Sequence, residues 1–272
     1  MFLFLIFSPL NKKKMASQFI LNYVGTKYQE SKMLNLNIDH YDTIVEVFGG
    51  SFGFSRFLWL NKNYKDKKYI IYDNNKELID FYNYLKNTNI KLFLQEYNSL
   101  CDTIFELFKT NKDKSQIKTK DSINWIEENV VDTNLKFLLI SNIKSSPVSR
   151  VYWKKNFAFE EMFACCEFIH QDFTLIDLSI YDKQKTLLYC DPPYAFECNS
   201  FYIKKEEDTQ YKNFWERLIY LFKDENYNCI LIHSYNFLVD YILKKYIHQT
   251  YLKKYGTTGN KREHYVYFKS SE

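Results

Sequence analysis

Residues 43–53 read T-I-V-E-V-F-G-G-S-F-G and predict the first unit of the fold. Residues 43–48 are short, β-branched and apolar apart from Glu46, which is typical of a buried strand. The adjacent glycines Gly49 and Gly50 allow the backbone to approach a ligand where any Cβ atom would collide. The order of strand, glycine turn and helix therefore predicts a parallel α/β sheet with a nucleotide-like ligand at the strand end.

A second strand and a helix continue this pattern. Residues 68–72 read K-Y-I-I-Y and predict a buried strand that ends at Asp73, and residues 78–85 carry apolar side chains at helical spacing. Asp73 lies about 25 residues after the first strand, where doubly wound folds place a carboxylate against ribose hydroxyls. The two strand ends together predict an adenosine-containing cofactor.

The rest of the chain alternates between helical and strand-rich regions. Residues 89–168 have helical periodicity, a lysine-rich segment at 109–120 and no clear pair of buried strands, which predicts an inserted helical module. Strand patterns return at 186–190, 229–233 and 264–268, with a helix around 214–222. We therefore predict one α/β domain over 15–88 and 169–272, with the module at 89–168. Residues 1–14 are predicted to be an upstream extension, because Met15 follows three lysines.

The predicted strand at 186–190 runs directly into D-P-P-Y, residues 191–194. Proline fixes φ and lacks an amide proton, so the loop is stiff and its carbonyl groups are not taken up by a strand ladder. Asp191 and a proline carbonyl can accept the two protons of an exocyclic amine and direct its lone pair toward an electrophilic methyl group. Tyr194 can stack on a base taken out of a duplex. A proline turn without a chemical role is the simpler alternative.

These motifs resemble those of the Dam-type adenine-N6 DNA methyltransferases, in which the cofactor motif precedes the catalytic motif. N-Y-V-G-T-K-Y at 22–28 resembles the family's YxGxK motif, and 45–51 resembles its cofactor loop. Residues 72–79 resemble the ribose-binding strand end, and Asp172-Phe173 resembles the acidic-Phe pair beside the cofactor adenine. Residues 191–194 match the catalytic DPPY motif, and Arg262-Glu263 resembles the late RxE segment.

The resemblance implies a doubly wound, Rossmann-like methyltransferase sheet with an inserted helical target-recognition module. It also implies S-adenosylmethionine as cofactor, no metal, and double-stranded DNA with a flipped-out adenine as substrate. The implied catalytic residues are Asp191, Pro192, Pro193 and Tyr194. The implied cofactor-binding residues are Tyr23, Gly25, Lys27, Glu46, Phe48, Gly50, Asp73, Asn74, Asp172, Phe173 and Asp191. For nucleic-acid binding we expect Arg150, which falls on the family's recognition segment at 137–152, with Lys154, Lys155 and Tyr202.

Phe52 departs from the family pattern, because it stands where a second glycine is usual. Either Gly53 replaces that glycine by a one-residue shift, or the loop is too crowded for the cofactor. Three alternatives to a DNA methyltransferase therefore stay open. They are an inactive nucleic-acid-binding protein of the same fold, an RNA adenine methyltransferase, and a small-molecule methyltransferase.

Composition bounds the remaining questions. The 37 Lys and Arg residues exceed the 33 Asp and Glu residues by four charges, which permits a polyanionic partner. The 6 cysteines include no CxxC pair, which predicts reduced thiols and an intracellular protein. Residues 1–7 are apolar but far shorter than a membrane span, so neither an anchor nor a secretion signal is expected. A companion restriction endonuclease and the oligomeric state stay open.

Overall fold

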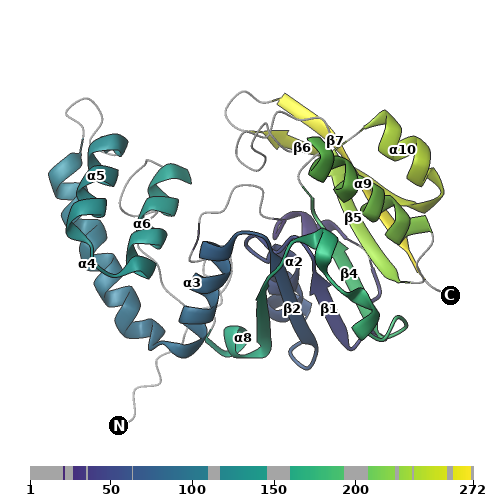
Figure 1. Cartoon of the computed structure of the whole chain (residues 1–272), viewed down its shortest axis with the longest axis horizontal. Helices are drawn as coiled ribbons and strands as arrows, with labels where there is room; N and C mark the ends of the chain where they lie inside the picture. Colours follow the sequence, from purple (N-terminus) through teal and green to yellow (C-terminus); the bar gives the residue numbers. More distant parts are fainter. Residues whose placement is uncertain are drawn as a thin grey trace, which may run out of the picture. The chain divides into compact units, whose positions relative to one another are not determined.

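The computed structural model describes residues 21, 27–34, 36–62, 64–109, 117–145, 160–192, 208–223, 227–234, 236–255 and 260–270 (Figure 1). The chain divides into two compact units. Lys27–Ile79 and Cys165–Glu272 form the first, which we call the sheet unit, and Met1–Thr26 and Asp80–Ala164 form the second, the helical unit.

Among the described residues, seven strands form one sheet in the order β3-β2-β1-β4-β5-β7-β6. Their bounds are β1 (Thr43–Glu46), β2 (Lys68–Asp73), β3 (Cys166–His170), β4 (Thr186–Cys190), β5 (Asn228–Ser234), β6 (Ile247–Tyr255) and β7 (Asn260–Lys269). Strands β3, β2, β1, β4 and β5 are parallel, and β7 is antiparallel to both β5 and β6. The strand order reverses between β1 and β4, and in open parallel sheets such a switch point lies beside the ligand site.

Helices cover both faces of this sheet. Tyr189 of β4 stacks on Phe54 of α2 (Gly53–Phe57), with ring centroids 4.2 Å apart. Its neighbours Leu188 and Cys190 instead belong to a buried cluster with Leu218 and further residues of α9 (Asp208–Lys223). Because side chains alternate along a strand, α2 and α9 lie on opposite faces. The doubly wound α/β prediction is confirmed.

Short helical segments complete the sheet unit. They are η1 (Glu30–Met33), the π-helical turn η2 (Leu58–Lys62), η3 (Phe173–Leu175), η4 (Leu178–Ile180), α10 (Phe237–Leu243) and η5 (Lys244–Tyr246). Asn236 caps α10 by accepting hydrogen bonds from the amides of Leu238 and Val239. Helices α9 and α10 lie next to each other beside β5 and β7 (Figure 1).

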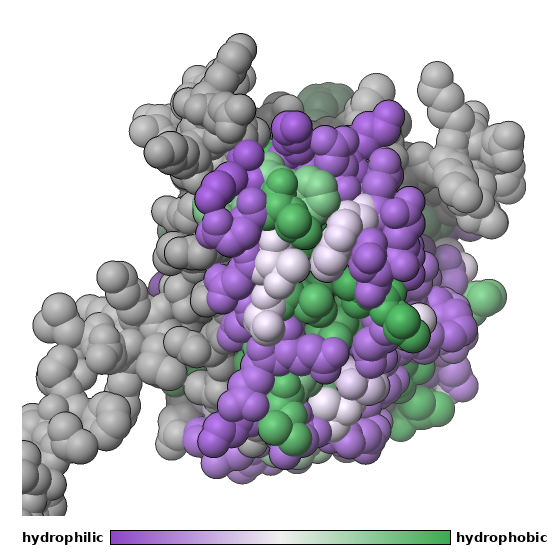
Figure 2. Space-filling model, turned by 90° about the vertical axis from the view of Figure 1, so that its left-hand side faces the viewer, coloured by the Kyte–Doolittle hydropathy of each residue, from purple (hydrophilic) through white to green (hydrophobic). Residues whose placement is uncertain are grey.

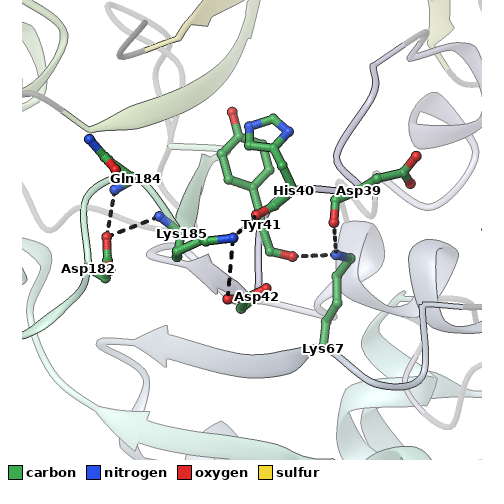
Figure 3. A network of polar contacts seen from close by, with 8 residues as sticks. All are labelled: Asp39, His40, Tyr41, Asp42, Lys67, Asp182, Gln184 and Lys185. Carbon is green, nitrogen blue, oxygen red and sulfur yellow. Dashed lines mark hydrogen bonds and ion pairs between the residues drawn. The ribbon is translucent and has the colours of Figure 1, made fainter.

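A polar network holds the amino ends of β1, β2 and β4 together (Figure 3). The buried Lys67 ammonium donates hydrogen bonds to the carbonyl oxygens of Tyr41 and, at 3.2 Å, Asp39. The Lys185 carbonyl accepts from the amides of Asp42 and Thr43 at 2.8 and 3.1 Å. These hydrogen bonds satisfy carbonyl groups that have no strand partner. The network therefore fixes the strands at their amino ends.

The helical unit contains most of α3 (Lys76–Asn87) and all of α4 (Ile90–Phe108), α5 (Thr119–Asn129) and α6 (Thr133–Ser145), and α8 (Glu160–Cys165) leads out of it. Asn89 begins α4 by accepting a hydrogen bond from the Leu92 amide at 3.2 Å. In the core, the Asn142 amide of α6 donates to the Tyr97 hydroxyl of α4 at 2.9 Å. The face in Figure 2 is mainly hydrophilic, with separate hydrophobic areas between polar side chains. None of the described helices combines the length and the apolar character that crossing a membrane requires.

The strands predicted at 43–48, 68–72, 186–190, 229–233 and 264–268 are confirmed as β1, β2, β4, β5 and β7. Two edge strands were not predicted. β3 begins at Cys166, three residues before the expected return to the sheet domain at 169. β6 reads I-H-Q-T-Y-L-K-K-Y, and its polar and lysine-rich character suits an edge but does not resemble a buried strand.

Candidate active site

The carboxyl ends of β1, β2 and β4 bring the predicted site residues of the sheet unit together. Glu46 is the last residue of β1 and is paired in register with Tyr189 of β4 and Ile71 of β2. Asp191 directly follows β4, and Asp73 ends β2. All these strand ends therefore lie at the switch point of the sheet, where the glycine turn also begins.

The turn at Gly49-Gly50 requires glycine at both positions. A Cβ atom on Gly49 would lie 2.4 Å from Ile71 Cγ2 and 3.0 Å from the Tyr72 carbonyl oxygen. Gly50 has φ of 46°, in the left-handed region that glycine adopts without strain. Hydrogen bonds hold the turn against β2, from the Gly49 amide to the Tyr72 carbonyl at 2.6 Å and from the Gly50 amide to Asp73 Oδ2 at 2.7 Å.

Asp73 therefore holds the backbone of the glycine turn in place. Its second oxygen, Oδ1, accepts from the Asn75 amide at 2.8 Å. Burial raises the pKa of Asp73, while the two backbone hydrogen bonds oppose that rise. Each carboxylate oxygen can accept more than one hydrogen bond, so Asp73 retains capacity for a hydroxyl group. The neighbouring Asn74 is exposed, and its carbonyl oxygen lies 3.2 Å from His170 Nε2 of β3.

Phe52 itself takes the conformation expected of the missing glycine. Its φ of 38° and ψ of 51° are left-handed, and Gly53 begins α2 instead of replacing it, so the one-residue shift is wrong. The Phe52 ring is 0 % exposed and packs edge-on against Phe168 of β3, with centroids 5.4 Å apart. The Arg56 guanidinium lies 5.8 Å from the same ring. The ring is thus part of the core and does not occupy the surface of the glycine turn.

Glu46 holds the start of α2. Its Oε1 accepts a hydrogen bond from the Ser55 amide at 2.7 Å, and the side chain is buried. Desolvation raises the pKa of Glu46 to about 7, although the Ser55 hydrogen bonds and the Arg56 charge oppose this rise. Glu46 is therefore an acid that titrates near neutral pH at the centre of the site.

Three phenylalanines form an aromatic cluster beside the glycine turn. Phe48 lies 4.9 Å from Phe173 and 5.2 Å from Phe214 of α9, measured between ring centroids. Arg217, one turn further along α9, donates to the carbonyl oxygens of Thr174, at 2.6 Å, and Ile176. The exposed Asp172 caps η3 by accepting from the Thr174 amide at 2.7 Å. Helix α9 thus fixes the segment that carries Asp172 and Phe173.

Asp191 forms an ion pair with Lys27. The Lys27 ammonium lies 2.6 Å from Oδ1 and 2.8 Å from Oδ2 of Asp191. The Lys27 side chain is 4 % exposed and that of Asp191 is 18 % exposed, so the carboxylate is the part that solvent reaches. Burial raises the pKa of Asp191, and the Lys27 charge and hydrogen bond oppose that rise. The pairing of two predicted residues 164 positions apart joins the N-terminal motif to the predicted catalytic loop.

Several predicted residues lie outside the described residues and stay predictions. They are Tyr23, Gly25, Arg150, Lys154, Lys155, Pro193, Tyr194 and Tyr202. Pro192 is described and is buried directly after Asp191. For Arg262 the description covers only the backbone, in β7.

Four residues of the site were not predicted, namely Glu30, Phe214, Arg217 and Lys253. Glu30 of η1 forms an ion pair with Lys253 of β6, 223 positions away in the chain. Phe214 and Arg217 lie in the amphipathic helix α9, and Lys253 lies in the lysine-rich edge strand β6. Only the pairing of distant elements reveals them, so no local pattern could have found them.

Comparison with known proteins agrees with this geometry. The D12 class N6 adenine-specific DNA methyltransferase family matches residues 23–258. The Type II methyltransferase M.FokI of Planomicrobium okeanokoites is 27 % identical over 223 residues, which cover 73 % of this chain. The match covers 31 % of M.FokI, so the chain spans about a third of that relative. Because the family match includes the glycine turn, Asp73, Asp191 and most of the sheet, the chain belongs to the D12 class N6 adenine-specific DNA methyltransferase family.

Proposed function

We propose that the protein transfers a methyl group from S-adenosylmethionine to the N6 amino group of adenine in DNA, with release of S-adenosylhomocysteine and of one proton from the amine. The observation that carries the proposal is the ion pair of Asp191 with Lys27 beside the glycine turn. Family membership supports the same reaction. Methyl transfer between two bound substrates needs close approach and orientation more than it needs acid or base strength.

The described residues fit S-adenosylmethionine. The turn at Gly49-Gly50 presents backbone without side chains, and Asp73 retains lone pairs for ribose hydroxyls. Phe48 and Phe173 offer aromatic surface for an adenine ring, next to the exposed Asp172. When bound, S-adenosylmethionine supplies a methyl group activated by a sulfonium centre.

Asp191 orients the target amine. Its carboxylate accepts a hydrogen bond from the exocyclic N–H, and this draws the nitrogen lone pair out of the ring and toward the methyl carbon. The carboxylate must be ionised to accept, and the Lys27 ammonium favours that ionised form against burial. We therefore assign Lys27 the role of keeping Asp191 charged and in place.

DNA binding is assigned to residues of the catalytic loop and the helical unit. Arg150, Lys154 and Lys155 are proposed to contact phosphates or base edges, and Tyr194 and Tyr202 to contact an extrahelical adenine. The relative is named a Type II methyltransferase, which supports a restriction-modification setting with a companion endonuclease. We place the enzyme where its DNA substrate lies, inside the cell.

The test is methyl transfer by purified protein. Unmethylated AT-rich double-stranded DNA is incubated with labelled S-adenosylmethionine, and the products are analysed as nucleosides. We expect label in N6-methyladenine and a loss of about 100-fold or more for Asp191→Asn. The matched control is Asp42→Asn, which makes the same change in an exposed ion pair at the amino end of β1 and should keep full activity.

The alternatives give different results in this assay. Label in RNA of the same composition but not in DNA would indicate an RNA adenine methyltransferase. DNA binding without label and without calorimetric binding of S-adenosylmethionine would indicate an inactive nucleic-acid-binding protein. The buried position of Phe52 counts against that second reading, because it leaves the glycine turn unobstructed.

A further inference from the structure

A second ion pair lies behind the pair of Lys27 and Asp191. Glu30 of η1 is 5 % exposed, and its carboxylate contacts the ammonium of Lys253 on β6. The Lys253 side chain is 23 % exposed, so this pair is also largely removed from water. Isolated charges at such depth are costly, and pairing within each ion pair offsets that cost.

The segment 27–33 links the two pairs mechanically. The Lys27 carbonyl accepts hydrogen bonds from the Ser31 amide at 2.8 Å and the Ser31 hydroxyl at 2.7 Å. The backbone that carries Lys27 is therefore folded onto η1. Strand β6 holds η1 at both ends, through Lys253 with Glu30 and through Gln249, which donates to the Met33 carbonyl at 3.1 Å.

The two pairs are also linked by charge. The charges of Glu30 and Lys253 both act on Asp191, the first opposing and the second favouring its ionised form. Ionised Asp191 and Glu30 with the two lysines thus form a cluster of two anions and two cations. Removing one member leaves an excess charge whose sign is known, in a region where burial weakens screening.

From this geometry we infer that Lys253 and Glu30 are positioning residues, which hold Lys27 on Asp191 and set the charge that acts on the catalytic carboxylate. The inference rests on the proposed methyl transfer for its kinetic consequences. The expected change in the ionisation of Asp191 is independent of the proposed methyl transfer, because that ionisation can be measured without turnover.

The charges of Asp191 and Lys27 also act on the pKa values of neighbouring groups, which stay unchanged in the test. These groups are Glu46 of β1, Tyr189 and Cys190 of β4, and His233 of β5. Any shift between variants therefore reports on Glu30 and Lys253.

The experiment compares Lys253→Met, Glu30→Gln and the double variant with the wild type. The ¹³C signal of the Asp191 carboxyl group, assigned with Asp191→Asn, is titrated by NMR, and kcat is measured against pH. In Lys253→Met we expect the Asp191 pKa and the acid limb of kcat to move up by about one pH unit, so that kcat at a given pH on that limb is lowered about tenfold. Glu30→Gln should move both downward, and the double variant should return them toward the wild type.

Two controls separate this role from a loss of folding. Lys253→Arg retains the charge and should restore the wild-type titration. Lys68→Met removes an exposed pair with Glu167, at 2.9 Å between β2 and β3, and should change neither readout. An unchanged Asp191 titration in folded Lys253→Met, or a double variant shifted as far as that single variant, would overturn the inference. Absent methyl transfer in the wild type with the expected NMR shifts would instead overturn the proposed function alone.

Discussion

Replacing Phe52 by glycine tests how the cofactor loop tolerates a bulky residue in a left-handed conformation. A left-handed non-glycine residue costs about 1–2 kcal/mol, which glycine would relieve. Loss of the fully buried ring would cost about 3–5 kcal/mol, because the cavity beside Phe168 would close only in part. The packing loss exceeds the strain relief, so Phe52→Gly should lower the free energy of unfolding by about 1–4 kcal/mol.

Phe52→Ala is the matched control, since it loses the ring but keeps the backbone strain. It should be less stable than Phe52→Gly by about 1–2 kcal/mol. Urea unfolding followed by circular dichroism measures both variants. Equal stability of the two variants would refute the strain argument, and wild-type stability of Phe52→Gly would refute the packing argument. Calorimetry on folded Phe52→Gly should give wild-type affinity for S-adenosylmethionine, and a tenfold gain would mean that the ring crowds the loop after all.

Three further perturbations address the loop, the buried acid and the opposite end of the sheet. Gly49→Ala places a methyl group 2.4 Å from Ile71 Cγ2 and should lower the free energy of unfolding by about 1–3 kcal/mol and weaken S-adenosylmethionine binding. Urea unfolding and binding calorimetry that both match the wild type would contradict this. Because the folded-state pKa of Glu46, about 7, exceeds its ordinary value of 4.5, the folded protein binds the extra proton, and stability falls by roughly 3 kcal/mol as pH rises through this window. Glu46→Gln should remove that slope between pH 4.5 and 7, whereas parallel urea-unfolding profiles would argue against it. Lys67→Met removes hydrogen bonds to the carbonyl oxygens of Tyr41 and Asp39 and should lower the free energy of unfolding by about 1–3 kcal/mol. The kcat of the folded protein should stay unchanged, because Lys67 lies at the amino ends of the strands and the candidate site at their carboxyl ends. A fall in kcat equal to that of a site variant would contradict this separation.

The parallel core of the sheet could be predicted because its strands are buried on both faces. β4 and β5 consist entirely of buried residues, and such strands appear in the sequence as continuous apolar runs. β6 lies at an edge, where lysines and polar residues are compatible with a strand, so its sequence contains no signal of that kind.

The residues of the site also fall into a predictable group and an unpredictable one. Gly50, Asp73 and Asp191 were predictable because each lies at or shortly after the end of a buried strand, and strand ends converge at one edge of a parallel sheet. The pairing of Lys253 with Glu30 depends on how the antiparallel strands β6 and β7 fold back onto η1. The left-handed conformation of Phe52 was also beyond prediction, because residue type alone favours glycine there.

The division of the chain into two units allows one unit to be replaced while the other keeps its structure. Every described contact of the candidate site lies within the sheet unit, and residues 80–164 join it through helices, α3 at one end and α8 at the other. Helical connections keep their hydrogen bonds when the residues beyond them are replaced. Residues 80–164 can therefore be replaced as one segment, and we expect an exchange of this segment between relatives to leave the carboxylates, the glycine turn and the ion pairs of the candidate site in their present places.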